Sequence, residues 1–375
     1  MADGIVIIAD CEVVAAGLLL GATHANCPAV IMPLGCDVNV DTAALLYNGK
    51  RVAGGKKQDV TEFALPSGCS AGFFLAAEGL GLCLSANGVV NSAAHMASAY
   101  GCGVEIVTRA KDVLAPKRYL TKESYQNALC LLLATGTSVD AMCYLNPLFV
   151  ASGVKPSHTL AAELSAKVPR LADATSIVQV YKTLMNFVAK LVTKNAQFVS
   201  GDKLADAMEK CELSALETIS NTSGTVLVKG TACEDGGYAR IIDGVPVTFN
   251  GKAWVYQNIL DADEALCKGN IPSGSVIVVH AKDQNVGALV YTIIGMGLQN
   301  QMAIVTDGIC HTDSVLVVTA CRPTALDNEA FANIQTGDVI DIDLAKGKLN
   351  TSILAKDMKV RAKRNSPKKD TIYFM

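Results

Sequence analysis

A thiol and a carboxylate stand side by side near the start of this chain, as Cys11 and Glu12, between two apolar runs. Thiolates hold iron–sulfur clusters, whereas carboxylates bind oxygen-preferring cations. A helix N-terminus also lowers the pKa of a thiol placed there. The pair therefore indicates either a metal or redox site, or a buried cysteine beside a glutamate that interacts favourably with a helix dipole.

Two predicted strands and one predicted helix position this pair. Residues 4–9 form a short apolar run rich in β-branched side chains, which is typical of a strand covered on both faces. Residues 13–26 have the composition of a buried helix, and a second strand is expected at 29–34. In such a βαβ unit, Cys11 and Glu12 lie at the carboxyl end of a strand, where α/β proteins place ligands.

The pattern of the chain changes near residue 220. Helical patterns occur before this point, at 124–134, 139–151, 159–166, 176–193 and 203–211. Short β-rich runs separated by glycine follow it, at 225–228, 245–249, 276–280, 303–305, 315–320 and 339–342. We expect an α/β fold class: an N-terminal parallel-sheet domain (1–220), a mainly β, barrel-like C-terminal domain (221–355) and a basic tail (356–375).

Composition argues against several functional classes. The 375 residues are 50% hydrophobic, which is enough for two cores, and the net charge of −3 gives no reason to expect nucleic-acid binding. Asp10 and Glu12 interrupt the apolar N-terminal segment, so neither a signal peptide nor a membrane span is expected. The 13 cysteines are scattered without a CxxC pair, which argues against a zinc ribbon. Most lie in apolar surroundings, which favours a reducing, cytoplasmic location.

The tail is strongly basic. Residues 356–375 carry seven Lys or Arg against two Asp, a local net charge of +5. Such a run is usually solvated and flexible, and the alternative is an anchor on an acidic partner surface.

Several segments resemble, in the same order, segments of the dihydroxyacid dehydratase and phosphogluconate dehydratase family. The first is Asp3-Gly-Ile-Val with Pro28-Ala-Val-Ile downstream, and the second is Gly68-Cys-Ser-Ala-Gly-Phe-Phe with Glu78-Gly-Leu-Gly-Leu. Further matching segments begin at Leu120, Val168, Ile271, Ala303 and Thr336. The resemblance covers nearly the whole chain, from Asp3 to about Ile353.

This resemblance implies a hydro-lyase that removes water from a sugar acid or a dihydroxy acid. The proton next to a carboxylate is poorly acidic and hydroxide is a poor leaving group, so the reaction needs a base, a cation on the carboxylate and a Lewis acid on the departing oxygen. Family members use magnesium for the second task and a [2Fe–2S] cluster, held by three cysteines, for the third.

The resemblance places the family's second cluster cysteine on Cys11, its neighbouring magnesium aspartate on Glu12, and its carbamylated lysine on Val13, which cannot be a ligand. The third cluster cysteine falls on Ser70, one residue from Cys69. The first cluster cysteine and the first magnesium carboxylate would lie on an N-terminal segment that this chain is expected to lack. The site is therefore expected to be degenerate, with Cys11 and Cys69 as remnants of the cluster positions.

In the second predicted domain, the family's magnesium glutamate has no counterpart, although Asp283 is acidic. The family's serine base falls on His311 or Thr312. His311 is either a general base, because an unperturbed histidine has a pKa of about 6.5, or a loop histidine without a role.

Three hypotheses follow from these residues. The first is a catalytically inactive member without a cofactor, reused as a structural or assembly subunit, as a homodimer or within a larger assembly. The second is a divergent hydro-lyase that uses Glu12, Asp283 and His311 with a divalent cation. The third is a sensor that binds a sugar acid between the domains.

Overall fold

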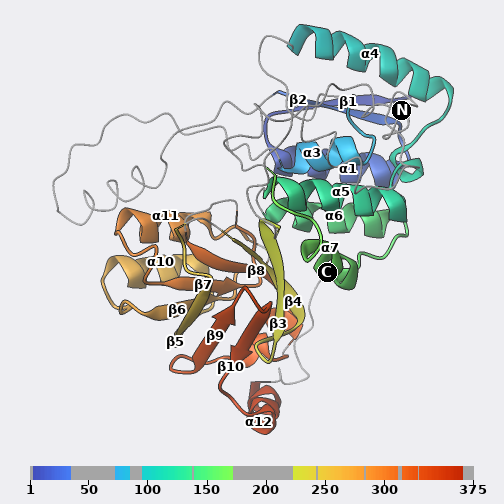
Figure 1. The fold of residues 1–375 in the computed structure, drawn as a ribbon. Coiled ribbons are helices and arrows are strands. Elements are labelled where there is room, and N and C mark those ends of the chain that lie inside the picture. Colours follow the sequence, from blue (N-terminus) through green and yellow to red (C-terminus); the bar gives the residue numbers. More distant parts are fainter. Residues whose placement is uncertain are drawn as a thin grey trace, which may run out of the picture. The chain divides into compact units, whose positions relative to one another are not determined.

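The computed structural model describes residues 3–34, 72–84, 95–136, 139–171, 223–241, 244–282, 284–310, 315–327 and 329–365. The described residues up to Thr225 belong to one compact unit, and those from Val226 belong to a second. Figure 1 shows a mainly helical first unit and a second unit built around β-strands.

The first unit begins with the predicted βαβ arrangement. Strand β1 (Ile5–Ala9) leads into helix α1 (Glu12–Ala25), and strand β2 (Ala29–Pro33) follows. The two strands are parallel and in register from Ile5 opposite Ala29 to Ala9 opposite Pro33. The described part of the expected N-terminal parallel sheet is therefore two-stranded.

Five further helices and one short 3₁₀ turn complete the described part of this unit: α3 (Gly72–Gly79), α4 (His95–Lys111), η2 (Pro116–Arg118), α5 (Lys122–Thr135), α6 (Asp140–Ala151) and α7 (His158–Ser165). The three helices predicted between residues 124 and 166 are confirmed as α5, α6 and α7. A reciprocal capping box between Thr121 and Ser124 starts α5, and Gly136 ends it in the left-handed conformation with φ 54°. The helices predicted at 176–193 and 203–211 lie outside the described residues.

Helix α4 is held by a buried arginine. The Arg109 guanidinium donates to the main-chain oxygens of Ala29 and Gly81, both at 2.9 Å, and to Glu105 Oε1 at 3.3 Å. It also lies over the Tyr119 ring, 4.2 Å from the centroid. These contacts attach α4 to β2 and to the turn that follows α3, because a fully buried guanidinium needs several acceptors.

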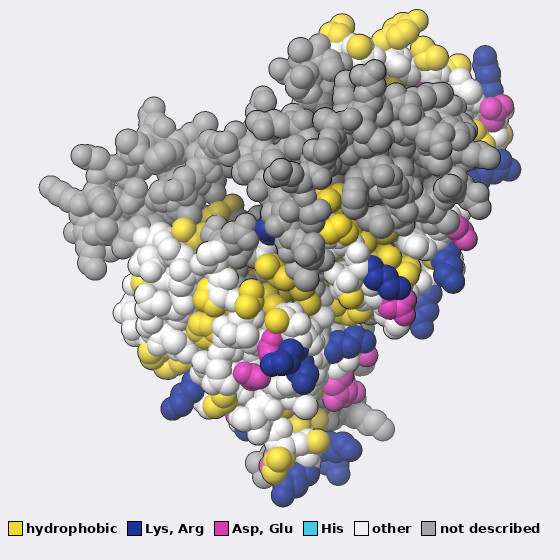
Figure 2. Space-filling model, viewed as in Figure 1, with side chains coloured by type: hydrophobic (Ala, Val, Ile, Leu, Met, Phe, Trp, Pro, Cys, Tyr) yellow, Lys and Arg dark blue, Asp and Glu magenta, His cyan; other side chains and the backbone are white. Residues whose placement is uncertain are grey.

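The opposite side of α4 is apolar and exposed. Hydrophobic side chains lie on this helix in Figure 2. Met96 is 83% exposed, Tyr100 77%, and Val104 and Val107 53% each. Their spacing of four, four and three residues places them on one side of the helix.

The second unit is a closed eight-stranded barrel, which confirms the expected barrel-like β region. Its strands are β3 (Thr225–Gly230), β4 (Cys233–Arg240), β5 (Thr248–Tyr256), β6 (Ser275–Val279), β7 (Ala303–Thr306), β8 (Leu316–Arg322), β9 (Val339–Asp343) and β10 (Lys348–Thr351). Their order around the barrel is β10-β3-β4-β8-β7-β6-β5-β9. Sequence patterns missed β4, which contains two glycines and three charged residues, and β10, which has four residues.

Strands β5, β6, β7 and β8 are parallel neighbours. Parallel strands need crossover connections, and helices α10 (Ile259–Cys267) and α11 (Gly287–Gly295) provide two of them. Asn258 starts α10, because its side-chain oxygen accepts the Asp261 N–H at 2.8 Å. The two helices pack on each other in an apolar cluster that is separate from the cluster inside the barrel.

Two short 3₁₀ turns, η3 (Ala325–Asp327) and η4 (Phe331–Asn333), follow β8, and helix α12 (Ala355–Asn365) follows β10. The described part of the predicted tail, residues 356–365, is helical and attached to the barrel, while Lys356, Lys359 and Lys363 are exposed to solvent. Met358 is buried, and Arg361 binds the Asp338 carboxylate through two nitrogens at 2.6 and 3.1 Å. A bidentate ion pair and a buried side chain hold this helix on the barrel.

No helix in the described parts of the chain combines the length and apolar character that a membrane span requires.

Candidate functional site

Cys11 and Glu12 lie where the sequence places them, directly after β1. Cys11 has an extended backbone, with φ −110° and ψ 125°, and precedes α1, while Glu12 is the first residue of that helix. Cys11 is partly exposed, whereas Glu12 is only 3% exposed. The two adjacent side chains therefore differ in environment: the thiol reaches solvent and the carboxylate does not.

The Glu12 carboxylate binds the beginning of another helix. Its Oε1 accepts the main-chain N–H of Phe73, in the first turn of α3, at 2.5 Å. The first N–H groups of a helix have no partner within the helix and carry partial positive charge. Glu12 thus lies at the N-termini of both α1 and α3, in surroundings that would also suit an external anion.

A tyrosine and a second buried acid lie close to Glu12. The Tyr144 hydroxyl donates to Asp140 Oδ2 at 3.3 Å, and the Tyr144 ring meets the Phe73 ring edge-on at 6.3 Å. Burial raises the pKa of Tyr144, and the negative charges of Asp140 and Glu12 raise it further. The phenol therefore stays protonated and acts as a hydrogen-bond donor.

These residues do not fit the cofactors of the family that the sequence resembles. An iron–sulfur cluster is normally held by thiolates, and magnesium needs oxygen ligands. Cys11 offers one thiol, Glu12 has committed one oxygen to Phe73, and Val13 is an aliphatic side chain that is 47% exposed. Among the residues that the structure describes, no group of three or more His, Cys, Asp or Glu side chains could hold a metal ion.

The other predicted site residues, Cys69, Asp283 and His311, lie outside the described residues. Their structural placement stays a prediction, and so do the cluster, magnesium and base roles assigned to them.

Polar side chains gather at one edge of the barrel, at the ends of its parallel strands. Gln257, His280 and Asp307 directly follow β5, β6 and β7, and Arg322 ends β8. The four strands are parallel, so these residues gather at one end of the barrel, where α/β proteins place ligands. Sequence analysis did not single out His280 or Asp307, although each is the first polar side chain after a buried apolar strand.

Asp307 is fully buried, and each of its two carboxylate oxygens accepts a main-chain N–H. Oδ1 accepts the Lys282 N–H and Oδ2 accepts the Ala325 N–H, both at 3.0 Å. The main-chain oxygen of Asp307 accepts from Arg322 Nη1, also at 3.0 Å. This carboxylate ties together three segments that are distant in sequence.

His280 is 4% exposed and its Nδ1 lies 3.2 Å from Gln257 Oε1. Its ring lies 5.2 Å from the Phe331 ring. Burial lowers the pKa of His280, and the charge of Asp307 and the backbone of Phe331 oppose this effect only in part. The imidazole is therefore held in its neutral form, the form that can accept a proton.

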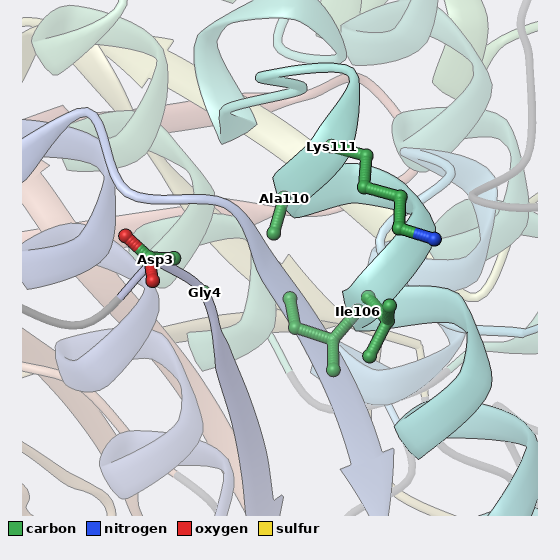
Figure 3. A pocket seen from close by; sticks show the side chains of 6 residues that line it. Asp3, Gly4, Ile106, Ala110 and Lys111 are labelled. Atoms are coloured by element: carbon green, nitrogen blue, oxygen red, sulfur yellow. The ribbon is translucent and has the colours of Figure 1, made fainter.

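The first unit also contains an open groove of about 510 Å³ between the start of β1 and α4. Its lining is mainly aliphatic, and the Lys111 side chain extends away from Asp3 (Figure 3). Asp3 and Lys111 are the charged residues of this lining, and they do not point toward each other. We therefore assign no chemistry to this groove.

A βαβ-containing first unit followed by a mixed eight-stranded barrel defines a two-unit α/β protein, and comparisons with known proteins identify its family. Residues 1–186 match the family model described as "Dihydroxy-acid/6-phosphogluconate dehydratase N-terminal", and residues 213–374 match the one described as "Dihydroxy-acid/6-phosphogluconate dehydratase C-terminal". The chain therefore belongs to the dihydroxy-acid and 6-phosphogluconate dehydratase family, as the resemblance indicated.

Curated relatives named dihydroxy-acid dehydratase are similar over nearly all of the chain. The protein from Caldicellulosiruptor saccharolyticus is 26% identical over 420 aligned residues, which cover 97% of this chain and 75% of the relative. The one from Pyrococcus abyssi is 24% identical over 418 aligned residues, covering 98% and 75%. The similarity extends across both units.

Proposed function

We propose that this chain retains the dehydratase body without cluster-dependent dehydration, and that it acts as a structural or assembly subunit. The observation that carries the proposal is the environment of Glu12. Its carboxylate is 3% exposed and accepts the Phe73 N–H at the start of α3. Glu12 stands where the family resemblance places a magnesium ligand, and here it supports the packing of two helices.

Recruiting Glu12 to a cation would have a structural cost. Turning the carboxylate away would leave the buried N–H of Phe73 without its acceptor, a loss of about 1–3 kcal/mol. The next position, Val13, supplies no ligand that could compensate. A hydro-lyase also needs a Lewis acid for the departing hydroxide, and Cys11 is the only thiol of this run.

The exposed apolar stripe on α4, defined by Met96, Tyr100, Val104 and Val107, supports an assembly role. Contiguous exposed apolar surface commonly marks a protein–protein contact. We assign a second copy of the chain as its partner, because an uncharged helical stripe can form a self-complementary two-fold interface. Sedimentation velocity should show a dimer that Tyr100→Glu dissociates. An exposed Leu260→Glu change on α10 serves as the control, and a monomeric unaltered protein would remove this surface from the proposal.

Helix α12 offers a second contact surface, for an acidic partner. Met358 and Arg361 attach the helix to the barrel, while Lys356, Lys359 and Lys363 are exposed. The three lysines recur every three or four residues and so lie on one side of the helix. Within the basic tail 356–375, we therefore assign the contact with an acidic partner to these three lysines. They can be replaced without changing Met358 or Arg361, which attach the helix to the barrel.

A turnover assay tests the proposal. The protein would be reconstituted with iron, sulfide and magnesium without oxygen, and supplied with a panel of 2,3-dihydroxy acids and sugar acids. The dihydroxy-acid dehydratase of Caldicellulosiruptor saccharolyticus serves as the positive control. We expect no 2-keto acid above background. Turnover that requires added iron and sulfide and is lost in Cys11→Ser would overturn the proposal.

The second candidate is a divergent hydro-lyase without a cluster, and the polar barrel edge favours it. A neutral, buried His280 near Asp307 can accept a proton, and Asp283 and His311 follow the same two strands, β6 and β7, in the sequence. If the chain is such a hydro-lyase, we expect dehydration of one of the acids that requires magnesium but not iron, and we expect His311→Ala to abolish it. The same panel of acids distinguishes a sensor from both an enzyme and a pure structural subunit. An acid that a sensor binds should raise the melting temperature of the protein without being converted to product.

A further inference from the structure

Two cysteines inside the barrel come from neighbouring strands. Cys233 is the first residue of β4 and Cys321 is the second-last residue of β8, and these strands pair antiparallel. Both side chains are 0% exposed and belong to the apolar cluster within the barrel. The dehydratase chemistry discussed above gives neither thiol a role.

The sulfur atom of each cysteine contacts the neighbouring strand. Cys233 donates its S–H to the main-chain oxygen of Arg322, 3.3 Å away, so its sulfur lies against β8. A Cβ added at Gly237 would lie 3.1 Å from Cys321 Sγ, so that sulfur lies against β4. The register shift between Gly236 and Tyr238 marks an irregularity in β4 beside this contact, and the two thiols hydrogen-bond each other.

The two thiols differ in acidity. The hydrogen bond from Cys321 lowers the pKa of the Cys233 thiol; burial opposes this effect, and backbone groups of Arg322 and Gly236 lower the pKa further. Burial raises the pKa of Cys321. The thiolate is the nucleophile in thiol oxidation, so the proposal below assigns the attack to Cys233, whose sulfur contacts the end of β8, and the second step to Cys321.

We propose that Cys233 and Cys321 form a peroxide-sensitive dithiol that closes to a disulfide across β4 and β8. The Cys233 thiolate attacks one oxygen of hydrogen peroxide, giving a sulfenic acid and releasing hydroxide. The Cys321 sulfur then forms the S–S bond with the Cys233 sulfur, and the displaced hydroxyl group takes up the Cys321 thiol proton and leaves as water. The hydroxide released in the first step combines with the proton that Cys233 lost on forming its thiolate. In sum, two thiols lose two electrons and two protons, and peroxide becomes two molecules of water.

This modification is independent of the proposed function, because it needs neither a cluster nor a substrate. The disulfide would close a loop of about 90 residues and restrict the unfolded chain, so the oxidised protein should melt about 5 °C or more above the reduced one. Since both thiols are buried, only a small oxidant should reach them, and they should react more slowly than the exposed Cys267.

Peptide mapping after peroxide treatment of the full-length native protein tests this proposal. Trypsin with Asp-N endoproteinase separates Cys233, in residues 230–234, from Cys321, in residues 313–326, and places Cys310 in its own fragment, 307–312. Remaining thiols would be blocked with iodoacetamide before digestion. We expect residues 230–234 linked to 313–326 as the main intramolecular disulfide.

Single variants give the matched controls. Cys321→Ala should lose the disulfide and the rise in melting temperature, and should accumulate a Cys233 sulfenic acid that dimedone traps. Cys310→Ala should retain both properties. The disulfide-linked peptide is measured in the unaltered protein, so the test stands even if Cys321→Ala folds poorly. Oxidation of Cys267 without the 233–321 linkage, or linkage of Cys233 mainly to another cysteine, would overturn the proposal.

Discussion

Each of the two units buries a carboxylate within three residues of the end of a parallel strand, and in each the carboxylate accepts hydrogen bonds from the backbone. Glu12 follows β1 and accepts the N–H of Phe73 at the start of α3. Asp307 follows β7 and accepts two N–H groups, from Lys282 and Ala325. Both positions are strand ends where α/β proteins place ligands, and in both the protein's own backbone is the partner.

The difference between the two acids lies in their accessible neighbours. Glu12 has a partly exposed thiol before it and an exposed valine after it, and the exposed acid at this strand end is Asp10. Asp307 lies at an edge that also carries His280, Gln257 and Arg322. At the first strand end the buried Glu12 carboxylate contacts the start of α3, whereas the second strand end carries the buried His280, which can accept a proton.

The largest expected effect on stability is at Asp307. Asp307→Ala removes both acceptors and leaves two backbone N–H groups without their partners, so the free energy of unfolding should fall by about 3–5 kcal/mol. Asp307→Asn keeps one acceptor oxygen and should lose less than Asp307→Ala. Urea denaturation followed by circular dichroism measures both. Equal losses in the two variants would contradict the idea that these hydrogen bonds account for most of the stability that Asp307 contributes.

Glu12 should show the same pattern at a smaller scale, because its carboxylate accepts the N–H of Phe73 at the start of α3. We expect Glu12→Ala to cost about 1.5–3 kcal/mol, and Glu12→Gln to cost less because an amide oxygen can still accept from Phe73. The same denaturation experiment applies. A Glu12→Ala protein of unchanged stability would show that the carboxylate is held there for another reason, such as metal binding.

His280 sharpens the comparison through pH. Its pKa is lowered in the folded protein, so the unfolded chain takes up a proton first as the pH falls below about 6.5. The stabilising contribution is thus complete above this pH and is lost as the pH falls toward the folded pKa. The urea concentration at the midpoint of unfolding should decrease when the pH is lowered from 7.5 to 5.5. The His280→Gln variant should show a smaller decrease. An identical pH dependence in the variant would contradict this assignment.

The smallest stability effect is expected on the exposed side of α12. Replacing Lys356, Lys359 and Lys363 by Glu should change the free energy of unfolding by less than about 0.5 kcal/mol, since exposed charges contribute little. Binding of an acidic peptide such as polyglutamate, measured at low ionic strength, should be lost. Arg361→Gln is the contrast, because it breaks the ion pair with Asp338 and should reduce stability while leaving the three lysines in place.

Sequence patterns located much of this architecture because the relevant signals are local. The run of β-branched residues at 4–9 and the apolar segment that follows predicted β1 and α1 to within two residues at each boundary. Strand β4 escaped because its glycines and charged residues suit the irregular register opposite β8, and that register depends on tertiary pairing. The helical tail escaped because its stability comes from Met358 and Arg361 contacting the barrel, which no window of the tail sequence can show.

The candidate site was predictable in position and less so in role. The spacing of Cys11 and Glu12 after a strand indicated the correct strand end, but the partner of Glu12 is Phe73, sixty-one residues away. No local pattern reports such a contact. His280 and Asp307 show the converse case, because their position after buried strands was visible, whereas their backbone partners and burial depend on how the barrel closes.

The most direct test of the account is the iron, acid-labile sulfide and magnesium content of the protein purified without oxygen, measured together with its visible absorption spectrum. The account predicts a colourless, folded protein with far less than one iron per chain and no increase after reconstitution. Stoichiometric iron and sulfide, with charge-transfer absorption that Cys11→Ser removes, would contradict it and would establish a working cluster site at the end of β1.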